Sequence, residues 1–166
     1  MMYKTPLQLI STIILFVIPC LFYGQNPSLE WINALQGPDV DEANSITTGP
    51  EGNVYTTGWF YNSVDFDPGI GDNTISTPIG AGTFVQKSDP NGNVIWTKTY
   101  DFSIGYNIKV GSDGFVYVCG TFTGTVDFDT GASVVSLTAL GFGDVFILKL
   151  TDLGDLVWAK SLATSS

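Results

Sequence analysis

Two stretches of sequence decide the fold of this chain: Gly52-Asn53-Val54-Tyr55-Thr56-Thr57-Gly58-Trp59-Phe60 and Gly114-Phe115-Val116-Tyr117-Val118-Cys119-Gly120-Thr121-Phe122. Each stretch runs from a glycine into β-branched and aromatic residues, a composition that is typical of a β-strand. Successive side chains of a strand point to opposite faces, and in both stretches neither face is strongly polar. We therefore expect strands that are covered on both sides, as in a sheet held between two others.

An offset of 62 residues relates these stretches, and the same offset relates most of the chain to itself. Between residues 46–98 and 108–160, 17 of 53 aligned positions are identical, and they are mostly Gly, aromatic residues and Asp. Because these residue types set backbone shape and packing, the match indicates one structural unit that is present twice. The repeated positions that we expect to be structural are Gly58, Phe60, Phe66, Trp96, Gly120, Phe122, Phe128 and Trp158.

Each unit is expected to hold about four strands. The turn sequences Asp89-Pro90-Asn91-Gly92 and Asp152-Leu153-Gly154 each join an apolar strand to a strand that carries a tryptophan. A further tryptophan strand, Leu29-Glu30-Trp31-Ile32, precedes the first unit. Four strands in about 60 residues, repeated in register, are typical of a β-propeller blade. We predict an all-β fold with about two four-stranded propeller-type blades, an N-terminal Trp strand and no helix after residue 24.

The segment boundaries follow from these patterns. We expect a signal peptide at residues 1–24, a lead-in strand at 25–45, the first propeller repeat at 46–98 and the second at 99–166. Propellers close with about four to eight blades, so two units form an incomplete propeller. The chain is therefore expected to be the N-terminal piece of a longer repeat protein, or one of several chains that assemble into a ring. Its exposed apolar blade faces predict self-association.

The first 24 residues differ in composition from the rest of the chain. Lys4 gives a positive start, an apolar run extends from Ile13 to Phe22, and Gly24 is a small residue before polar sequence. This pattern predicts a helical secretory signal peptide and a secreted or cell-surface protein. A permanent anchor is the alternative, but a spanning helix needs about 20 apolar residues, so we expect no membrane segment after cleavage. Cys20 leaves lipidation open.

The composition excludes several classes of chemistry. The chain has no His and no Arg, so it cannot build a Ser-His or Cys-His nucleophile, an imidazole metal site or a guanidinium clamp for phosphate. A net charge of −10 repels nucleic acid. Once the signal is removed only Cys119 remains, so no internal disulfide can form. Apolar burial must therefore stabilise the fold.

The ordered motifs of the units resemble a known family. Gly-Asn-Val-Tyr-x-x-Gly-x-Phe, Val-Asp-Phe-Asp-x-Gly, Phe-x-x-Lys and Gly-x-x-x-Trp-x-Lys, at residues 52–60, 64–69, 84–87 and 92–98, are similar to the bacterial secreted β-propeller repeats called SBBP. The resemblance covers nearly all of the chain after the signal. It implies an extracellular or cell-surface protein with many repeats, and it assigns no catalytic residue.

Acidic residues recur at equivalent positions of the two units. Asp65 and Asp67 share one face of a strand, and Asp127 and Asp129 repeat the pair. Their separation of about 7 Å would suit the carboxylates of a glycoside hydrolase, but a pair that is repeated argues for aspartates that bind backbone N–H groups in turns. Calcium is a further alternative, because Asp72 adds a third carboxylate near the first pair. We expect no catalytic residue and no other cofactor.

Lysines and tryptophans also recur. We expect the lysines to pair with repeat-equivalent aspartates while their stems cover aromatic neighbours. The tryptophans could stack on sugar rings, but their regular recurrence favours packing between units. The residues are Lys87, Lys98, Lys149, Lys160, Trp31, Trp96 and Trp158.

These observations predict a non-catalytic, secreted or cell-surface scaffold that offers loops to a protein or a glycan. One alternative is an extracellular hydrolase or lyase that uses only carboxylates and tyrosine. Another is a structural adhesin segment. A carboxylate with a strongly shifted pKa in a pocket would favour the enzyme, whereas aspartates held in turns would favour the scaffold.

Overall fold

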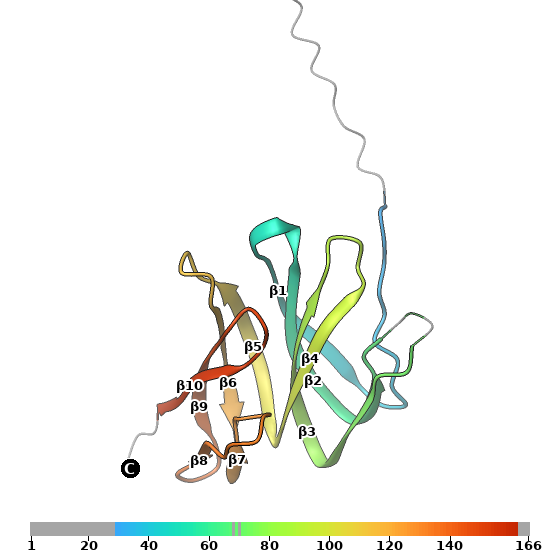
Figure 1. The fold of residues 1–166 in the computed structure, drawn as a ribbon. Helices are drawn as coiled ribbons and strands as arrows, with labels where there is room; N and C mark the ends of the chain where they lie inside the picture. Colours follow the sequence, from blue (N-terminus) through green and yellow to red (C-terminus); the bar gives the residue numbers. More distant parts are fainter. Residues whose placement is uncertain (1–28, 68, 70, 163–166) are drawn as a thin grey trace, which may run out of the picture.

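Antiparallel β-strands make up most of the described part of the chain (Figure 1). The computed structural model describes residues 29–67, 69 and 71–162, so the predicted signal peptide and Cys20 lie outside the described residues. Within that part the fold is all-β, as the sequence predicts, with no α-helix and one 3₁₀ turn, η1 (Pro50–Gly52). None of these residues belongs to a helix with the length and hydropathy that a membrane span requires.

The strands form two four-stranded sheets and one short ribbon. The first sheet comprises β1 (Asp41–Thr48), β2 (Val54–Asp65), β3 (Thr74–Ser88) and β4 (Val94–Asp101), in that order. The second comprises β5 (Ser103–Val110), β6 (Val116–Phe122), β9 (Asp144–Leu150) and β10 (Leu156–Leu162), in that order. The ribbon pairs β7 (Thr125–Asp127) with β8 (Ser136–Thr138). Neither sheet closes on itself, because each ends on two different edge strands.

The offset that relates the two sequences also relates the strands. β5 covers the residues equivalent to β1, and β10 begins 62 residues after β4. The long strands β2 and β3 correspond in the second unit to β6 with β7 and to β8 with β9. Asn62, where β2 bulges, has a φ of 58°, and its equivalent Gly124 has a φ of 65°. Both need the left-handed region, which Gly and Asn adopt most readily. The predicted four strands per unit are confirmed.

Gly58 and Gly120 allow two backbones to approach closely. A Cβ atom on Gly58 would lie 1.9 Å from the carbonyl oxygen of Glu42, and one on Gly120 would lie 2.0 Å from that of Ile104. In both units the edge strand, β1 or β5, has an irregular register at this point. The neighbouring backbone therefore excludes a side chain, which explains why the sequence repeats glycine here.

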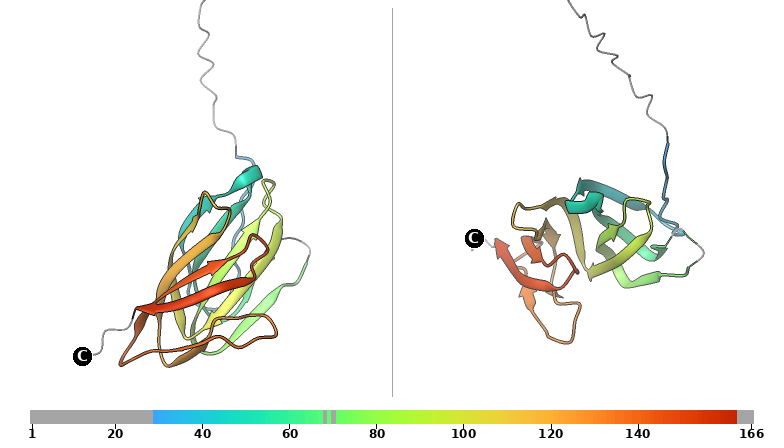
Figure 2. Two further views of the ribbon diagram at one scale, coloured as in Figure 1. Left: turned by 60° about the vertical axis from the view of Figure 1, so that its left-hand side comes forward. Right: turned by 45° about the horizontal axis from the view of Figure 1, so that its top comes forward.

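The two sheets pack against each other and share one hydrophobic core. In Figure 2 the second unit lies beside the first, and β5 contacts β1, β2 and β3. Tyr55 and Tyr100 of the first sheet are buried against Val116, Val118 and Leu150 of the second. A smaller cluster lies elsewhere in the first unit and comprises Phe60, Val64, Phe66 and Phe84, with Leu35 and Ile75 at its border. The repeated phenylalanines are all buried, namely Phe60, Phe66, Phe84, Phe122, Phe128 and Phe146.

The expectation of strands covered on both faces holds for β2 and is wrong for β6. In β2, Tyr55 and Phe60 point to opposite faces, and both are fully buried. In β6, Val116 is fully buried, but Tyr117, the equivalent of Tyr55, is only half-buried. The second sheet covers the Tyr55 side of the first sheet, whereas among the described residues no further sheet covers the Tyr117 side of the second.

The expectation of an N-terminal Trp strand is wrong. Residues 29–35 belong to no strand, and the next residue, Gln36, forms an isolated bridge with Asp65. Trp96, by contrast, lies in β4, which pairs with β3. Residues 29–35 have no such neighbouring strand in the described part of the chain, and a strand needs a ladder to satisfy its backbone groups. The first strand, β1, begins at Asp41, inside the predicted lead-in segment.

Candidate functional site

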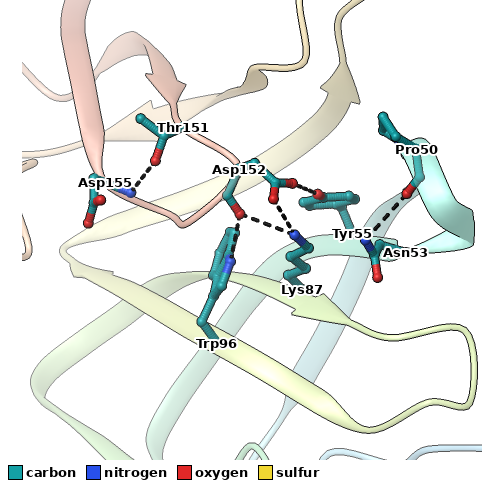
Figure 3. Close-up of polar contacts among 8 residues, drawn as sticks. All are labelled: Pro50, Asn53, Tyr55, Lys87, Trp96, Thr151, Asp152 and Asp155. Carbon is teal, nitrogen blue, oxygen red and sulfur yellow. Dashed lines mark hydrogen bonds and ion pairs between the residues drawn. The ribbon is translucent and has the colours of Figure 1, made fainter.

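A polar cluster around Asp152 joins the two sheets (Figure 3). Asp152 lies in the turn between β9 and β10, and its carboxylate accepts a hydrogen bond from the Tyr55 hydroxyl. The same carboxylate lies 2.7 Å from Nζ of Lys87. The backbone carbonyl of Asp152 accepts a hydrogen bond of 3.0 Å from Nε1 of Trp96. Side chains from β2, β3 and β4 of the first sheet thus hold a single turn of the second sheet.

The charges of this cluster stabilise each other. The Lys87 side chain is 6% exposed, so its ammonium group needs an anionic partner, and Asp152 supplies one from a side chain that is 54% exposed. Hydrogen bonds from Lys87 and Tyr55 lower the pKa of Asp152, which is therefore ionised at neutral pH. Burial and the hydrogen bond to Asp152 raise the pKa of Tyr55, which therefore stays protonated. The arrangement fixes the two units together, and every polar group in it has a partner.

The tryptophan contact of this cluster occurs a second time. Nε1 of Trp31 donates a hydrogen bond of 2.9 Å to the carbonyl of Pro90, and Pro90 is the repeat equivalent of Asp152. A Cβ atom on Gly92 would lie 2.8 Å from the Trp31 ring, and one on Gly154 would lie 3.1 Å from the Trp96 ring. Each indole therefore lies over the glycine of a turn. Residues 29–35 occupy, relative to the first unit, the place that β4 occupies relative to the second.

The same three side chains recur on the second sheet as Tyr117, Lys149 and Trp158. Here they meet an acid of their own sheet, because Asp113 accepts hydrogen bonds of 2.7 Å from the Tyr117 hydroxyl and 3.0 Å from Nζ of Lys149. These bonds lower the pKa of Asp113 to about 2. Nζ of Lys149 also lies 3.9 Å from the centroid of the Phe115 ring. The second sheet thus carries the same tyrosine and lysine, paired with a different acid, on its open side, and within the described residues no turn carbonyl accepts a hydrogen bond from Trp158.

The predicted pairing of lysines with repeat-equivalent aspartates is wrong in its detail. Lys87 and Lys149 are equivalent, but their partners Asp152 and Asp113 are not. The sequence comparison missed both acids, because proline stands at the equivalent of Asp152 and Glu51 at that of Asp113. A search for identical residues discards such positions. Asp152 could still have been noticed, because it is an acidic residue in the predicted turn Asp152-Leu153-Gly154.

The repeated aspartates bind backbone N–H groups in turns. Oδ1 of Asp65 accepts hydrogen bonds from the N–H groups of Asp67 and Asn73, at 2.9 and 3.1 Å. Oδ1 of Asp127 accepts the equivalent bonds from Asp129 and Val135, at 3.0 and 2.9 Å. The two units thus close this loop in the same way.

The other predicted acids have similar partners. Oδ1 of Asp67 accepts a bond from the N–H of Gly69 at 3.0 Å, and Oδ1 of Asp72 accepts one from the N–H of Thr74 at 3.1 Å. Asp129 binds the N–H of Gly131 at 2.8 Å. Across residues 29–67, 69 and 71–162, no three acidic or cysteine side chains are gathered as metal ligands. The structure therefore does not bring the calcium candidates together.

A cleft of about 530 Å³ lies between β4 and the β7–β8 ribbon. Carboxylates and hydroxyl groups line much of it, and burial raises the pKa of one of these carboxyls, that of Asp101. Burial also raises the pKa of Tyr100. The sequence identified two of the acids that line this cleft but not Asp101, because its repeat equivalent is alanine. The residues that line the cleft include Lys98, Tyr100, Asp101, Asp127 and Asp129.

Comparisons of the chain with protein-family models, with curated proteins and with solved structures found no match. The geometry of the site offers two features: a recurrent contact that fixes one unit to the next, and a cleft with acidic and hydroxyl groups beside that contact.

Proposed function

We propose that the chain is a non-catalytic, secreted or cell-surface scaffold of β-propeller-type repeats that binds a protein or a glycan. The observation that carries this proposal is the tryptophan-on-turn contact, which Trp31 makes with the first unit and Trp96 with the second. Units that meet by one recurrent contact can be added in series, which is how blades and other repeats are built. The resemblance to secreted propeller repeats and the composition of residues 1–24 support export.

The recurrent packing leaves the connections and clefts of the units available for binding. The Tyr55 side of the first sheet is buried in the contact between the two units, so we place the contacts to a protein or a glycan in the loops and clefts. The cleft beside β4 combines carboxylates, threonine hydroxyls and Lys98, which can exchange hydrogen bonds with the hydroxyl groups of a sugar. We therefore place the binding of a glycan, the first of the two ligand classes to test, in this cleft.

Binding of the purified chain to an array of oligosaccharides tests this function. We expect Asp101→Ala to abolish the binding of any oligosaccharide that the unchanged chain retains, because Asp101 lines the cleft. Glu51→Ala is the matched control, since Glu51 lies in the β1–β2 turn at the opposite end of the strands. Loss of binding in the control alone, or no retention on the array, would contradict a glycan site in the cleft.

One observation favours a second candidate, a hydrolase or lyase that uses carboxylates. Burial raises the pKa of Asp101, and a carboxyl of raised pKa that lines the same cleft as Asp127 and Asp129 is the type of group that acts as a general acid. The release of reducing ends from polysaccharides separates the candidates. The scaffold predicts none, whereas the enzyme predicts release that Asp101→Asn abolishes.

A further inference from the structure

The open side of the second sheet is the repeat equivalent of a covered side of the first. We name it the Tyr117 face and define it by Tyr117, Val145, Ile147, Lys149 and Trp158. Val145 is 39% exposed, and the other four are half-buried. Their equivalents in the first sheet are covered by the second unit: Tyr55, Thr83 and Val85 are fully buried, Lys87 is 5% exposed, and Trp96 lies on the turn of residues 151–154.

The opposite side of the first sheet is equivalent, by the repeat, to the side of the second sheet that packs on the first sheet. We name it the Ile46 face and define it by Ile46, Val54 and Thr56. Ile46 is 67% exposed, whereas its equivalent Ile108 is 3% exposed in the shared core. Val54 and Thr56 are half-buried, whereas their equivalents, both valines of β6, are fully buried. The chain therefore contains one complete contact between units. The Tyr117 face is one uncovered half of the same contact, and the Ile46 face is the other half, where Trp31 occupies the position of the tryptophan.

We propose that a second copy of this chain binds head to tail, with the Tyr117 face of one copy packed on the Ile46 face of the other. The contact would repeat the one that joins the two units within a chain. Such an interface is heterologous, because it uses two different surfaces, and it leaves a free face at each side of the dimer. The inference rests on the repeat geometry and not on the proposed ligand.

The charges of the two faces are compatible with this contact. Lys149 already has a carboxylate partner, Asp113, within its own sheet. The turn that would meet it carries Pro90 where Asp152 stands in the second unit, so it brings no carboxylate at that position. The Asp89 carboxylate of the same turn already accepts hydrogen bonds from Asn91 and Asn93. Lys87 shows the reverse arrangement, because its acid comes from the neighbouring turn. Each lysine thus has one acid, and the head-to-tail contact covers Lys149 together with its counter-charge.

The contact also has a ready hydrogen-bond acceptor for Trp158. In the second copy the carbonyl of Pro90 accepts a hydrogen bond from Trp31 of its own chain. Trp158 would take the place of Trp31, so one indole bond replaces another. Residues 29–35 belong to no strand, so their displacement breaks no sheet ladder. Removal of the Trp31 ring should therefore favour association.

Sedimentation velocity of the purified chain over a range of concentrations tests the proposal. We expect association that Ile46→Asp and Val145→Asp each weaken by at least about tenfold, because either change places a carboxylate inside the contact. Phe142→Asp is the matched control, since Phe142 is fully exposed and lies outside both faces. We expect it to associate like the unchanged chain. Leu162→Asp replaces Val145→Asp if that variant unfolds, because Leu162 of β10 is 60% exposed and is the cross-strand neighbour of Val145 on the same side of the sheet.

Mixing the two variants tests the head-to-tail geometry itself. Ile46→Asp leaves the Tyr117 face intact and Val145→Asp leaves the Ile46 face intact, so an equimolar mixture should form a one-to-one dimer and nothing larger. Trp31→Ala should strengthen the association of the otherwise unchanged chain. A single species of monomer mass at all concentrations, or a mixture that stays monomeric, overturns the proposal. Because glycan binding is measured separately, a monomer that binds the array would leave the proposed function standing.

Discussion

Pro90 and Asp152 occupy the same position of the turn in the two repeats, and the backbone carbonyl of each accepts a hydrogen bond from a tryptophan indole. Only the side chain differs between them. Asp152 adds a carboxylate that binds Lys87 and Tyr55, and proline cannot. The carbonyl contact therefore defines where a tryptophan meets a turn, and the carboxylate strengthens one of the two contacts. The stability of the chain should reflect this division.

Trp96→Phe should lower the free energy of unfolding by about 1 kcal/mol, which is the net value of one hydrogen bond. The phenyl ring keeps an aromatic group over Gly154 but cannot donate to the carbonyl of Asp152. Urea denaturation followed by far-UV circular dichroism measures the change. Trp158→Phe is the matched control, and it should change stability less because no turn lies over Trp158 in the described part of the chain. Equal effects would contradict the role of the indole bond.

Asp152→Ala should lower the free energy of unfolding by about 2 kcal/mol, because it leaves the buried ammonium group of Lys87 without its counter-charge. Asp113→Ala removes the equivalent acid from the exposed cluster and should have a smaller effect, since water can solvate Lys149 there. Chemical denaturation of both variants in the same buffer compares them. A larger loss for Asp113→Ala would show that the cluster at the interface does not stabilise the contact between the units.

Acid should weaken the folded state through the same two carboxylates. Hydrogen bonds from Lys87 and Tyr55 lower the pKa of Asp152, and bonds from Tyr117 and Lys149 lower that of Asp113 from 3.8 to about 2. A lowered carboxyl pKa gives stability that is present above the unfolded value and is lost as the pH falls through the folded value. Thermal unfolding between pH 5 and about pH 2 should show this loss. Asp152→Asn should flatten the slope, and an unchanged slope would argue against it.

Asp41→Asn should raise the free energy of unfolding at pH 7 by about 0.5 kcal/mol. Burial raises the pKa of Asp41, and Asp39 adds repulsion. The Oδ1 atom of Asp41 is buried and has no hydrogen-bond partner among the described residues. A raised carboxyl pKa means that ionisation costs stability above that pKa. The gain should therefore shrink as the solution is acidified and the native carboxyl is protonated. Thermal melts at pH 7 and pH 4 measure the difference, and a gain that grows in acid would contradict this explanation.

Gly120→Ala should lower the free energy of unfolding by about 3 kcal/mol, because its Cβ atom would lie 2.0 Å from a backbone oxygen that cannot move without breaking the β5–β6 ladder. Gly114→Ala is the matched control. No atom lies within 4 Å of a Cβ atom on Gly114, so only its φ of 79° opposes alanine, at a cost of about 1 kcal/mol. Guanidinium denaturation ranks the two, and the reverse order would rule out the close approach of the strands.

The strands of this chain could be predicted from its sequence because the repeat provides two residues for most structural environments, and residues that are identical in both units indicate what that environment requires. Glycine at positions 58 and 120 and the buried phenylalanines are identical in both units, since the same backbone and the same core surround them. The exposure of Ile46 and Ile108 could not be predicted in this way. It depends on what lies beside each unit, and identical residues carry no information about a neighbour.

The cluster of Tyr55, Lys87, Trp96 and Asp152 could not be predicted from the sequence for a related reason. Lys87 recurs in the second unit as Lys149, but its partner Asp152 belongs to a turn whose equivalent carries proline. A contact between two units joins positions that do not align with each other. The residues of the cleft, such as Asp101, could not be predicted for the same reason, since the cleft forms only where β4 meets the β7–β8 ribbon.

The contact between a tryptophan and a turn glycine gives the row of repeated units a direction. Trp31 and Trp96 each contact the unit that follows them in the chain, at Gly92 and Gly154 respectively. Because both units carry a tryptophan and a turn at equivalent positions, the insertion of a whole unit would preserve the indole contact with the turn carbonyl at the insertion point. The acid that pairs with the buried Lys87 would be kept only where the unit that follows carries an aspartate at the position of Asp152 rather than a proline as at Pro90.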